Sequence, residues 1–260
     1  MYQTILYTQK NHIAIVTINR PEYGNAFSEE TYEEIIDVMH EIDENEQIDV
    51  AILTGAGKYF CSGGDIRFFQ KMIDNEENIS EENVLLTGQM VKSIKKNSKP
   101  VIAAINGVAA GAGLGLAMAC DFILMGENSQ LIPAFINMAF PGDTALIYTL
   151  HQAIGTFQTK KHVMLNEPIT ATLAQEYGIA YDVVLDEDLE EAANQLATKL
   201  VQAPTEAIGY QKALMAEMFY PEIEAFNQKE AEYMHKSSKS KEHKEAVAAF
   251  LSKRKPDFKK

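Results

Sequence analysis

Apolar residues follow two different periodicities along the first two thirds of the chain. Short runs rich in β-branched residues predict strands, whereas apolar residues that recur every three or four positions predict amphipathic helices. The two kinds of segment alternate, which favours βαβ-type units and an α/β fold. Strands are expected at 4–7, 12–19, 50–54, 101–105, 122–125, 130–132 and 183–185, and helices after Ser28 and at 66–73, 84–94, 112 onward, 145–154, 159–165 and 171–177.

The final third has a different pattern, because helical periodicity continues there without a further strand. Helices are expected at 189–202, 205–218, 221–236 and 241–251. We expect this helical region to cover a binding site or a neighbouring subunit. An earlier segment, 74–83, is acidic and polar and lacks periodicity, which predicts a mobile connection.

Charge and cysteine content narrow the class of protein. The 260 residues carry a formal net charge of −14, which argues against nucleic acid or an anionic membrane as the main partner. The two cysteines, Cys61 and Cys120, form no disulfide framework, and the scattered histidines have no metal-ligand spacing, so we expect no bound metal. Without a signal peptide or membrane-spanning run, the sequence predicts a cytoplasmic protein.

A glycine-rich turn joins the most apolar predicted strand, 101–105, to a helix that should begin near Gly111 or Ala112. The first N–H groups of a helix are unpaired and carry partial positive charge, so they can hold an oxygen anion. Close helix packing through small residues is the alternative explanation. No Gly-Lys-Ser/Thr follows and the glycines do not form GxGxxG, which excludes a P-loop and a dinucleotide fingerprint.

A second turn of the same kind lies earlier in the chain. Residues 60–66, FCSGGDI, follow the strand at 50–54 and open another helix, which places the N–H of Gly64 at a helix start. Two such turns in an alternating chain suggest that the N–H groups of Gly64 and Ala112 converge on one carbonyl oxygen. An acyl thioester suits this geometry, because its enolate or tetrahedral anion needs two donors roughly 2.7–3.1 Å away.

At these turns the chain resembles the crotonase family, also called the enoyl-CoA hydratase/isomerase family. The resemblance implies an α/β fold with a crotonase-like ββα spiral core at 1–190, which carries the site, and a C-terminal helical region at 191–260. It also implies a homotrimer or hexamer and an acyl-CoA substrate, with coenzyme A as part of the substrate and no separate cofactor. The stretches that carry it are NRP and NAF within 19–27, LTGAGKYFCSGGDI at 53–66, KPVIAAINGVAAGAGLGLA at 99–117 and AFLSKRKPDF at 249–258.

Site positions can be transferred from the family residue by residue. The resemblance implies that Gly64 and Ala112 supply the two oxyanion N–H groups. Arg67 would lie near the CoA phosphates, with a solvated surface charge as the alternative. The positions expected to contact the substrate or its CoA moiety are Asn25, Ala26, Ser62, Asp65, Ile66, Arg67 and Phe135.

The acid/base positions distinguish the reactions within this family. Hydratases place glutamates where this chain has Gly115 and Phe135, and neither residue can move a proton, so hydration is doubtful. Asp143 matches the catalytic aspartate of an isomerase branch that includes the phenylacetate-pathway isomerase. Asp143 would take a proton from C2 of a 3-enoyl-CoA and return it to C4, and apolar neighbours such as Phe140 and Leu146 should raise its pKa.

Three alternatives remain open for this site. Asp143 follows Pro-Gly and could simply cap the helix predicted at 144–154. A 4-chlorobenzoyl-CoA dehalogenase-like reaction would use Asp143 as a nucleophile, but that branch has Trp and His where this chain has Phe135 and Gly88, and the chain contains no Trp. A non-catalytic acyl-CoA-binding scaffold is the third possibility. The sequence leaves the acyl group undefined.

Overall fold

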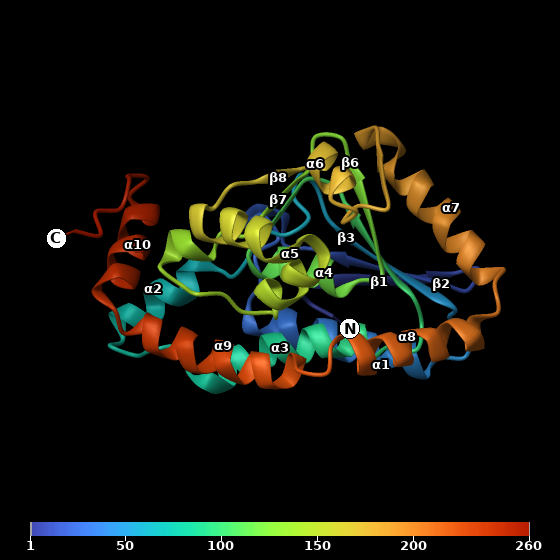
Figure 1. Ribbon diagram of the computed structural model, residues 1–260, viewed down its shortest axis with the longest axis horizontal. Coiled ribbons are helices and arrows are strands. Elements are labelled where there is room, and N and C mark those ends of the chain that lie inside the picture. The colour runs from blue at the N-terminus through green and yellow to red at the C-terminus, as the bar shows by residue number, and fades with distance from the viewer. Residues whose placement is uncertain (1, 260) are drawn as a thin grey trace.

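Two β-sheets lie at the centre of the structure, a computed structural model that describes residues 2–259 (Figure 1). In the larger, six-stranded sheet β1 and β2 are antiparallel, and all the remaining neighbouring strands are parallel. Its strands, in spatial order, are β1 (Ile5–Lys10), β2 (Ile13–Ile18), β3 (Val50–Gly55), β4 (Val101–Ile105), β6 (Phe122–Gly126) and β9 (Asp182–Val184). The smaller sheet contains β5 (Val108–Ala110), β7 (Gln130–Ile132) and β8 (Ile169–Thr170).

The chain moves between the two sheets in a repeated β-β-α order. Strand β4 belongs to the larger sheet, β5 to the smaller one, and α4 (Ala112–Ala119) follows. The next unit repeats the pattern with β6, β7, the short 3-10 helix η2 (Phe135–Met138) and α5 (Leu146–Leu165). Successive units thus place equivalent strands in the same two sheets. The predicted α/β fold class, in which strands lead into helices, is confirmed.

Helices α1 and α3 pack against the central layers. Helix α1 (Glu29–Glu44) begins with a capping box in which Ser28 and Thr31 bond each other's backbone N–H groups. Its predicted apolar face is buried in the main core. Helix α3 (Glu81–Lys95) lies beside α1 and α4. The shorter elements are η1 (Pro21–Tyr23), α2 (Ile66–Asp74), α6 (Ala171–Glu176) and η3 (Asp186–Asp188).

The C-terminal helical region covers two different surfaces. Helix α7 (Leu189–Val201) packs on the larger sheet, whereas α9 (Ile223–Ser238) runs beside α3 and α10 (Lys241–Leu251) contacts α2 and η2 (Figure 1). Helix α8 (Thr205–Phe219) connects α7 to α9. Within residues 2–259, no helix has the length and apolar character needed to cross a membrane.

The structure differs from the sequence expectations in a few segments. The predicted mobile connection at 74–83 is partly ordered by packing, because Ser80 caps α3 and Ile79 is only 4% exposed within an apolar cluster. The helices expected at 145–154 and 159–165 form one element with a non-helical break at Gly155. Strands β5 and β8 were missed because β5 lies inside the glycine-rich turn and the two residues of β8 are too few to show a period.

Candidate active site

The two glycine-rich turns lie against each other, as the sequence predicts. A parallel bridge joins them: the Cys61 N–H donates to the Val108 carbonyl at 3.1 Å, and the Ala110 N–H donates to the Cys61 carbonyl at 2.8 Å. Gly63 has a φ of +102°, and a Cβ there would lie 3.2 Å from the Ala110 carbonyl oxygen. Glycine therefore permits both the left-handed backbone and the close approach of the two turns.

The N–H groups of Gly64 and Ala112 face away from the backbone bonds that hold their turns. The Phe27 N–H donates to the Gly63 carbonyl at 2.8 Å, and the Asp65 N–H donates to the Phe27 carbonyl at 3.0 Å. Gly64 lies between these two bonds, so its own N–H and carbonyl point away from Phe27. Ala112 is the first residue of α4, where helix N–H groups have no intrahelical partner. Neither N–H donates to another backbone group within residues 2–259.

Both residues line one cavity of about 500 Å³. Its polar wall consists of the two turns, and the rest is mostly apolar side chains that would suit an acyl group. Helices α9 and α10 contribute Met234, Phe250 and Leu251, so part of the C-terminal helical region lines this cavity. Other apolar lining residues are Phe69, Ile79, Val84, Leu86, Phe135, Met138 and Phe140.

Asp143 enters the same cavity from the segment before α5. Its side chain lines the cavity although the residue is only 7% exposed, and its Oδ1 has no hydrogen-bond partner among the described residues. Burial raises the pKa of Asp143 from 3.8 to about 7, against the opposing effect of a hydrogen bond with the Thr144 side chain. A carboxyl with this pKa can both accept and release a proton near neutrality.

The helix-capping interpretation of Asp143 is wrong. The N-cap position of α5 is occupied by Ala145, and no side chain caps this helix end. Only the Asp143 backbone takes part in the turn, since its carbonyl accepts the Leu146 N–H at 3.1 Å. The Asp143 carboxyl is therefore available to the cavity.

Sequence analysis missed a second buried carboxyl, that of Glu230 on α9. Glu230 is 7% exposed; its Oε2 accepts the Ala145 N–H at 2.9 Å, and its Oε1 has no partner within residues 2–259. Burial, reinforced by the negative charge of Asp143, raises the pKa of Glu230 to about 8. The available signal was its helical spacing from the apolar residues Ile223 and Met234, which places Glu230 on the buried face of α9.

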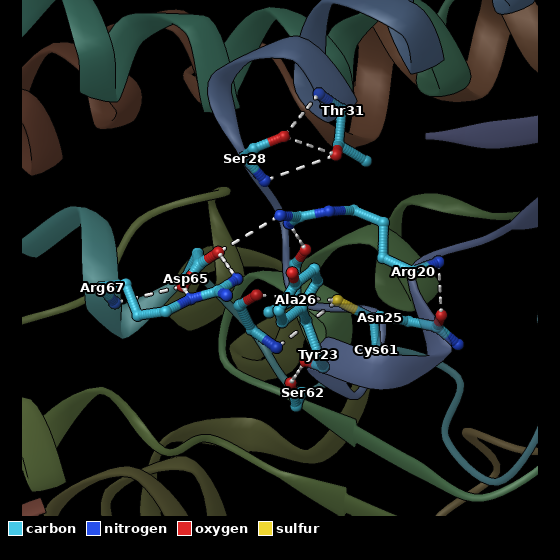
Figure 2. Close-up of polar contacts among 11 residues, drawn as sticks. Arg20, Tyr23, Asn25, Ala26, Ser28, Thr31, Cys61, Ser62, Asp65 and Arg67 are labelled. Carbon is cyan, nitrogen blue, oxygen red and sulfur yellow. Dashed lines mark hydrogen bonds and ion pairs between the residues drawn. The ribbon is translucent and has the colours of Figure 1, made fainter. Parts of the chain in front are cut away.

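A charged cluster forms the rim of the cavity (Figure 2). Asp65 caps α2 by accepting the Arg67 N–H at 3.1 Å, and its carboxylate pairs with the Arg67 and Arg20 guanidinium groups at 2.5 and 3.2 Å. Burial alone would raise the pKa of Asp65, but the hydrogen bonds from Arg67 outweigh it and lower that pKa. The Arg67 guanidinium lies 3.6 Å from the centre of the Tyr23 ring, half exposed at the rim.

The expected CoA contacts separate into two groups. Ala26, Ser62 and Ile66 line the cavity together with Asp65, Arg67 and Phe135. Asn25 does not: it is fully buried and accepts the Arg20 N–H at 2.9 Å (Figure 2). Its side-chain amide also donates to the Ala56 and Tyr59 carbonyls at 2.9 and 2.6 Å. Because these bonds use both polar atoms of its side chain, Asn25 shapes the loop and its side chain does not supply the expected contact.

Neighbouring side chains fill the two positions at which related reactions would need a catalytic residue. A Cβ on Gly115 would lie 1.8 Å from Thr144 Oγ1, so the site has no room there for a hydratase-type glutamate. A Cβ on Gly88 would lie 2.6 Å from Asn227 Nδ2, so a histidine does not fit either. Asp143, next to Thr144, is the buried carboxyl among the described residues that line the cavity.

The cysteines and histidines give no sign of another chemistry in the described part of the chain. Cys61 and Cys120 are free and buried, and burial raises the pKa of each thiol to about 12. A thiol with so high a pKa is a poor nucleophile at neutral pH. No cluster of three or more His, Cys, Asp or Glu side chains within residues 2–259 could hold a metal ion.

Comparisons with known proteins agree with this geometry. The family model for enoyl-CoA hydratase/isomerase matches residues 8–260. The chain is similar to 1,2-epoxyphenylacetyl-CoA isomerase from Escherichia coli (strain K12), at 29% identity over 99% of both chains. It is 28% identical to trans-2-decenoyl-[acyl-carrier-protein] isomerase from Streptococcus mutans, over 99% of this chain and 98% of the other.

The fold also agrees with a solved structure. The crystal structure of an enoyl-CoA hydratase from Mycobacterium avium subsp. paratuberculosis K-10 matches with a TM-score of 0.91 at 25% identity, over the full length of both chains. Sequence motifs, paired turns and overall fold thus agree along the chain. The chain belongs to the enoyl-CoA hydratase/isomerase family, the crotonase family, as its motifs predicted.

Proposed function

We propose that this enzyme shifts a carbon–carbon double bond in an acyl-CoA thioester, converting a 3-enoyl-CoA to a 2-enoyl-CoA. The observation that carries the proposal is the position of Asp143. Among the described residues, it is the one buried carboxyl that lines the cavity formed by Gly64 and Ala112. The other two carboxyls of the wall are the exposed Glu29 and the ion-paired Asp65.

One carboxyl is sufficient for this reaction. The ionised Asp143 accepts a proton from C2, and the electron pair moves through the C3–C4 double bond and the carbonyl group to give a dienolate. The N–H groups of Gly64 and Ala112 stabilise the negative oxygen. The protonated Asp143 then returns the proton to C4, which forms the conjugated 2-enoyl thioester and restores the carboxylate.

The competing reactions need groups for which this cavity has no equivalent. Hydration requires a second acid/base group, and Thr144 fills the space at Gly115 where a glutamate would stand. Dehalogenase-like chemistry needs the histidine and tryptophan that Gly88 and Phe135 replace. Two similar proteins are named isomerases, 1,2-epoxyphenylacetyl-CoA isomerase and trans-2-decenoyl-[acyl-carrier-protein] isomerase, which supports isomerisation, whereas a third, at 29% identity, is named crotonyl-CoA hydratase.

The direct test compares the wild-type enzyme with Asp143→Asn on a 3-enoyl-CoA. The growth of absorbance from the conjugated thioester measures the product. We expect the substitution to lower kcat by about 10²- to 10⁴-fold, since it removes the acid/base group without changing the size of the side chain. Equal rates for the two proteins would contradict the isomerase function.

Calorimetry with a saturated acyl-CoA separates catalysis from simple binding. We expect wild-type and Asp143→Asn proteins to bind this ligand with similar affinity, because the anion donors are main-chain groups. If both proteins bind the ligand but neither accelerates isomerisation of a 3-enoyl-CoA, the chain is an acyl-CoA-binding scaffold and not an isomerase.

We also propose that several copies of the chain associate, as a homotrimer or hexamer. Several large apolar side chains of α5 and α8 are exposed at the surface, which supports a contact between copies. They are Phe157, Met164, Leu165, Leu214, Met218 and Phe219. Light scattering after size-exclusion chromatography measures the mass, and a monomer of 29.0 kDa would contradict the proposal.

A further inference from the structure

The segment that follows Asp143 has an unusual backbone. Thr144 and Ala145 have φ values of +57° and +51°, so two consecutive residues with side chains adopt the left-handed conformation. That conformation is unfavourable for both residue types and persists only where surrounding contacts hold it. This turn sets the direction of the Asp143 side chain, because it lies between Asp143 and the start of α5.

Two side-chain acceptors hold this turn from neighbouring helices. Thr87 Oγ1 on α3 accepts the Thr144 N–H at 3.3 Å, and Glu230 Oε2 on α9 accepts the Ala145 N–H at 2.9 Å. The bond to Glu230 is the shorter of the two and joins parts of the chain that are 85 residues apart. Helix α9 therefore fixes the turn that carries the proposed acid/base residue.

Glu230 stands behind Asp143 and does not line the cavity. Its Oε1 and the Oδ1 of Asp143 are both buried without a hydrogen-bond partner in residues 2–259. Two carboxylates this buried cannot both remain ionised at low cost, since an unpaired buried charge is strongly disfavoured. A neutral Glu230 resolves the conflict, because its carbonyl oxygen can still accept the Ala145 N–H.

We propose that Glu230 is a positioning residue: its carboxyl group, protonated in the active enzyme, anchors the Ala145 N–H and keeps the Asp143 carboxylate turned into the cavity. This inference rests on the proposed function of Asp143 as the acid/base group. Glu230 touches neither substrate nor the reacting atoms and acts only through the turn and through its charge state.

The charge states of the two carboxyls agree with this role. Burial raises the pKa of Asp143 to about 7, and burial together with the Asp143 charge raises that of Glu230 to about 8. Around neutral pH the pair therefore carries one negative charge, on Asp143. Above about pH 8 an ionised Glu230 would place a second negative charge beside Asp143 and oppose formation of the dienolate.

The other titratable groups on the elements packed around this turn are kept neutral by burial or take part in ion pairs, ring contacts and hydrogen bonds. Residues 83–91 of α3 include no acidic or basic side chain. Burial raises the pKa of Tyr32 on α1 well above 10 and lowers the pKa of His243 on α10, so both are neutral. On α9, Lys229 and Lys236 each pair with Glu232. The Lys236 Nζ also lies 5.4 Å from the centre of the Tyr233 ring, and the His235 Nδ1 bonds the Ile79 carbonyl.

The test measures kcat/KM against pH for the wild-type enzyme, Glu230→Gln and Glu230→Ala, with Glu232→Gln as a matched control on the same helix. We expect the wild-type rate to rise through about pH 7 and to fall above about pH 8. Glu230→Gln can still accept the Ala145 N–H but cannot ionise, so it should keep the rise and lose the fall. Glu232→Gln should resemble the wild type.

Loss of the acceptor should act on catalysis rather than on binding. In Glu230→Ala the turn has no partner for the Ala145 N–H, so we expect kcat to fall by at least about tenfold while KM changes less than about threefold. If this variant does not fold, Glu230→Gln alone decides the question. A Glu230→Gln profile with an unchanged alkaline fall would overturn the inference.

A measurement without turnover separates this inference from the proposed function. Carbon-13 NMR of labelled Asp and Glu carboxyls follows the titration of Asp143. The signal of Asp143 is assigned as the one that disappears in Asp143→Asn. We expect two inflections in the wild-type protein and one in Glu230→Gln. Two inflections without isomerase activity would reject the proposed function and keep the coupling of Glu230 to Asp143, whereas one inflection in both proteins would reject the coupling.

Discussion

The candidate active site has two halves that face one cavity: a main-chain half, the N–H groups of Gly64 and Ala112, and a carboxyl half, the side chain of Asp143. The N–H groups of Gly64 and Ala112 belong to the main chain and carry no net charge. The Asp143 carboxyl is ionisable, buried and lacks a partner for one oxygen within residues 2–259. The main-chain half thus requires only a fixed backbone, whereas the carboxyl half lowers the stability of the folded protein whenever Asp143 is ionised.

Removal of one main-chain donor should have a large effect on activity. Ala112→Pro eliminates the N–H at the first residue of α4, a position where proline fits a helix without breaking an intrahelical hydrogen bond. We expect kcat for 3-enoyl-CoA isomerisation to fall by about 10²- to 10³-fold with little change in stability, measured by the absorbance assay and by thermal unfolding.

Lys241→Pro is the matched control for this substitution. Lys241 is the exposed first residue of α10. Proline there also occupies the first position of a helix, but it removes no N–H from the cavity. We expect activity close to that of the wild type. Full activity of Ala112→Pro would show that the N–H of Ala112 is not an oxyanion donor.

Substitution of the carboxyl should stabilise the protein at alkaline pH while it abolishes activity. The pKa of Asp143 in the folded state, about 7, exceeds its unfolded value, so its favourable contribution is complete below about pH 4 and is lost as pH rises through 7. Asp143→Asn should therefore be more stable than the wild type at pH 8, by about 1–4 kcal/mol, and nearly equal to it at pH 4. Denaturant unfolding at both pH values measures the difference.

An exposed carboxyl provides the comparison. Glu176→Gln changes a solvent-exposed side chain on α6 and should shift stability by less than about 0.5 kcal/mol at either pH. A wild-type protein as stable as Asp143→Asn at pH 8 would mean that the carboxyl is solvated and that the apolar cavity does not raise its pKa.

The two halves also differ in how far the sequence predicts them. Gly64 and Ala112 lie in short glycine-rich turns directly after strands, so a contiguous motif singles out both as candidates, and the structure places the turns side by side. Asp143 was predicted by its position in the family pattern. Glu230 was missed because its bond to the Ala145 N–H spans 85 residues and depends on how α9 lies across α3.

Similar reasons explain the other differences from the sequence expectations. Asn25 sits within a motif, but a motif does not show which way a side chain points, and Asn25 points into the loop. The segment 74–83 is polar, yet the single apolar residue Ile79 reaches a cluster formed with Phe140 and Met234. Contacts between distant elements therefore determine the details that local patterns leave open.

Gly115 connects the two halves, because it lies on α4 three residues after Ala112 and packs against Thr144, the neighbour of Asp143. Gly115→Ala would place a methyl group 1.8 Å from Thr144 Oγ1 and 2.4 Å from Thr144 Cβ, so the turn must move away from α4. We expect a loss of about 1–3 kcal/mol in the free energy of unfolding and a fall of about tenfold in kcat. Denaturant titration and the absorbance assay measure the two effects.

Gly178→Ala is the control for Gly115→Ala, because it should lower stability without displacing the turn after Asp143. Gly178 ends α6 with a φ of +73°, and an added Cβ there meets no atom within 4 Å. Gly178→Ala should therefore lower stability by about 1–2 kcal/mol through its left-handed backbone while kcat stays unchanged. If Gly115→Ala instead kept full kcat at a similar loss of stability, the packing of α4 on Thr144 would not set the position of Asp143, and the two halves of the site would be independent.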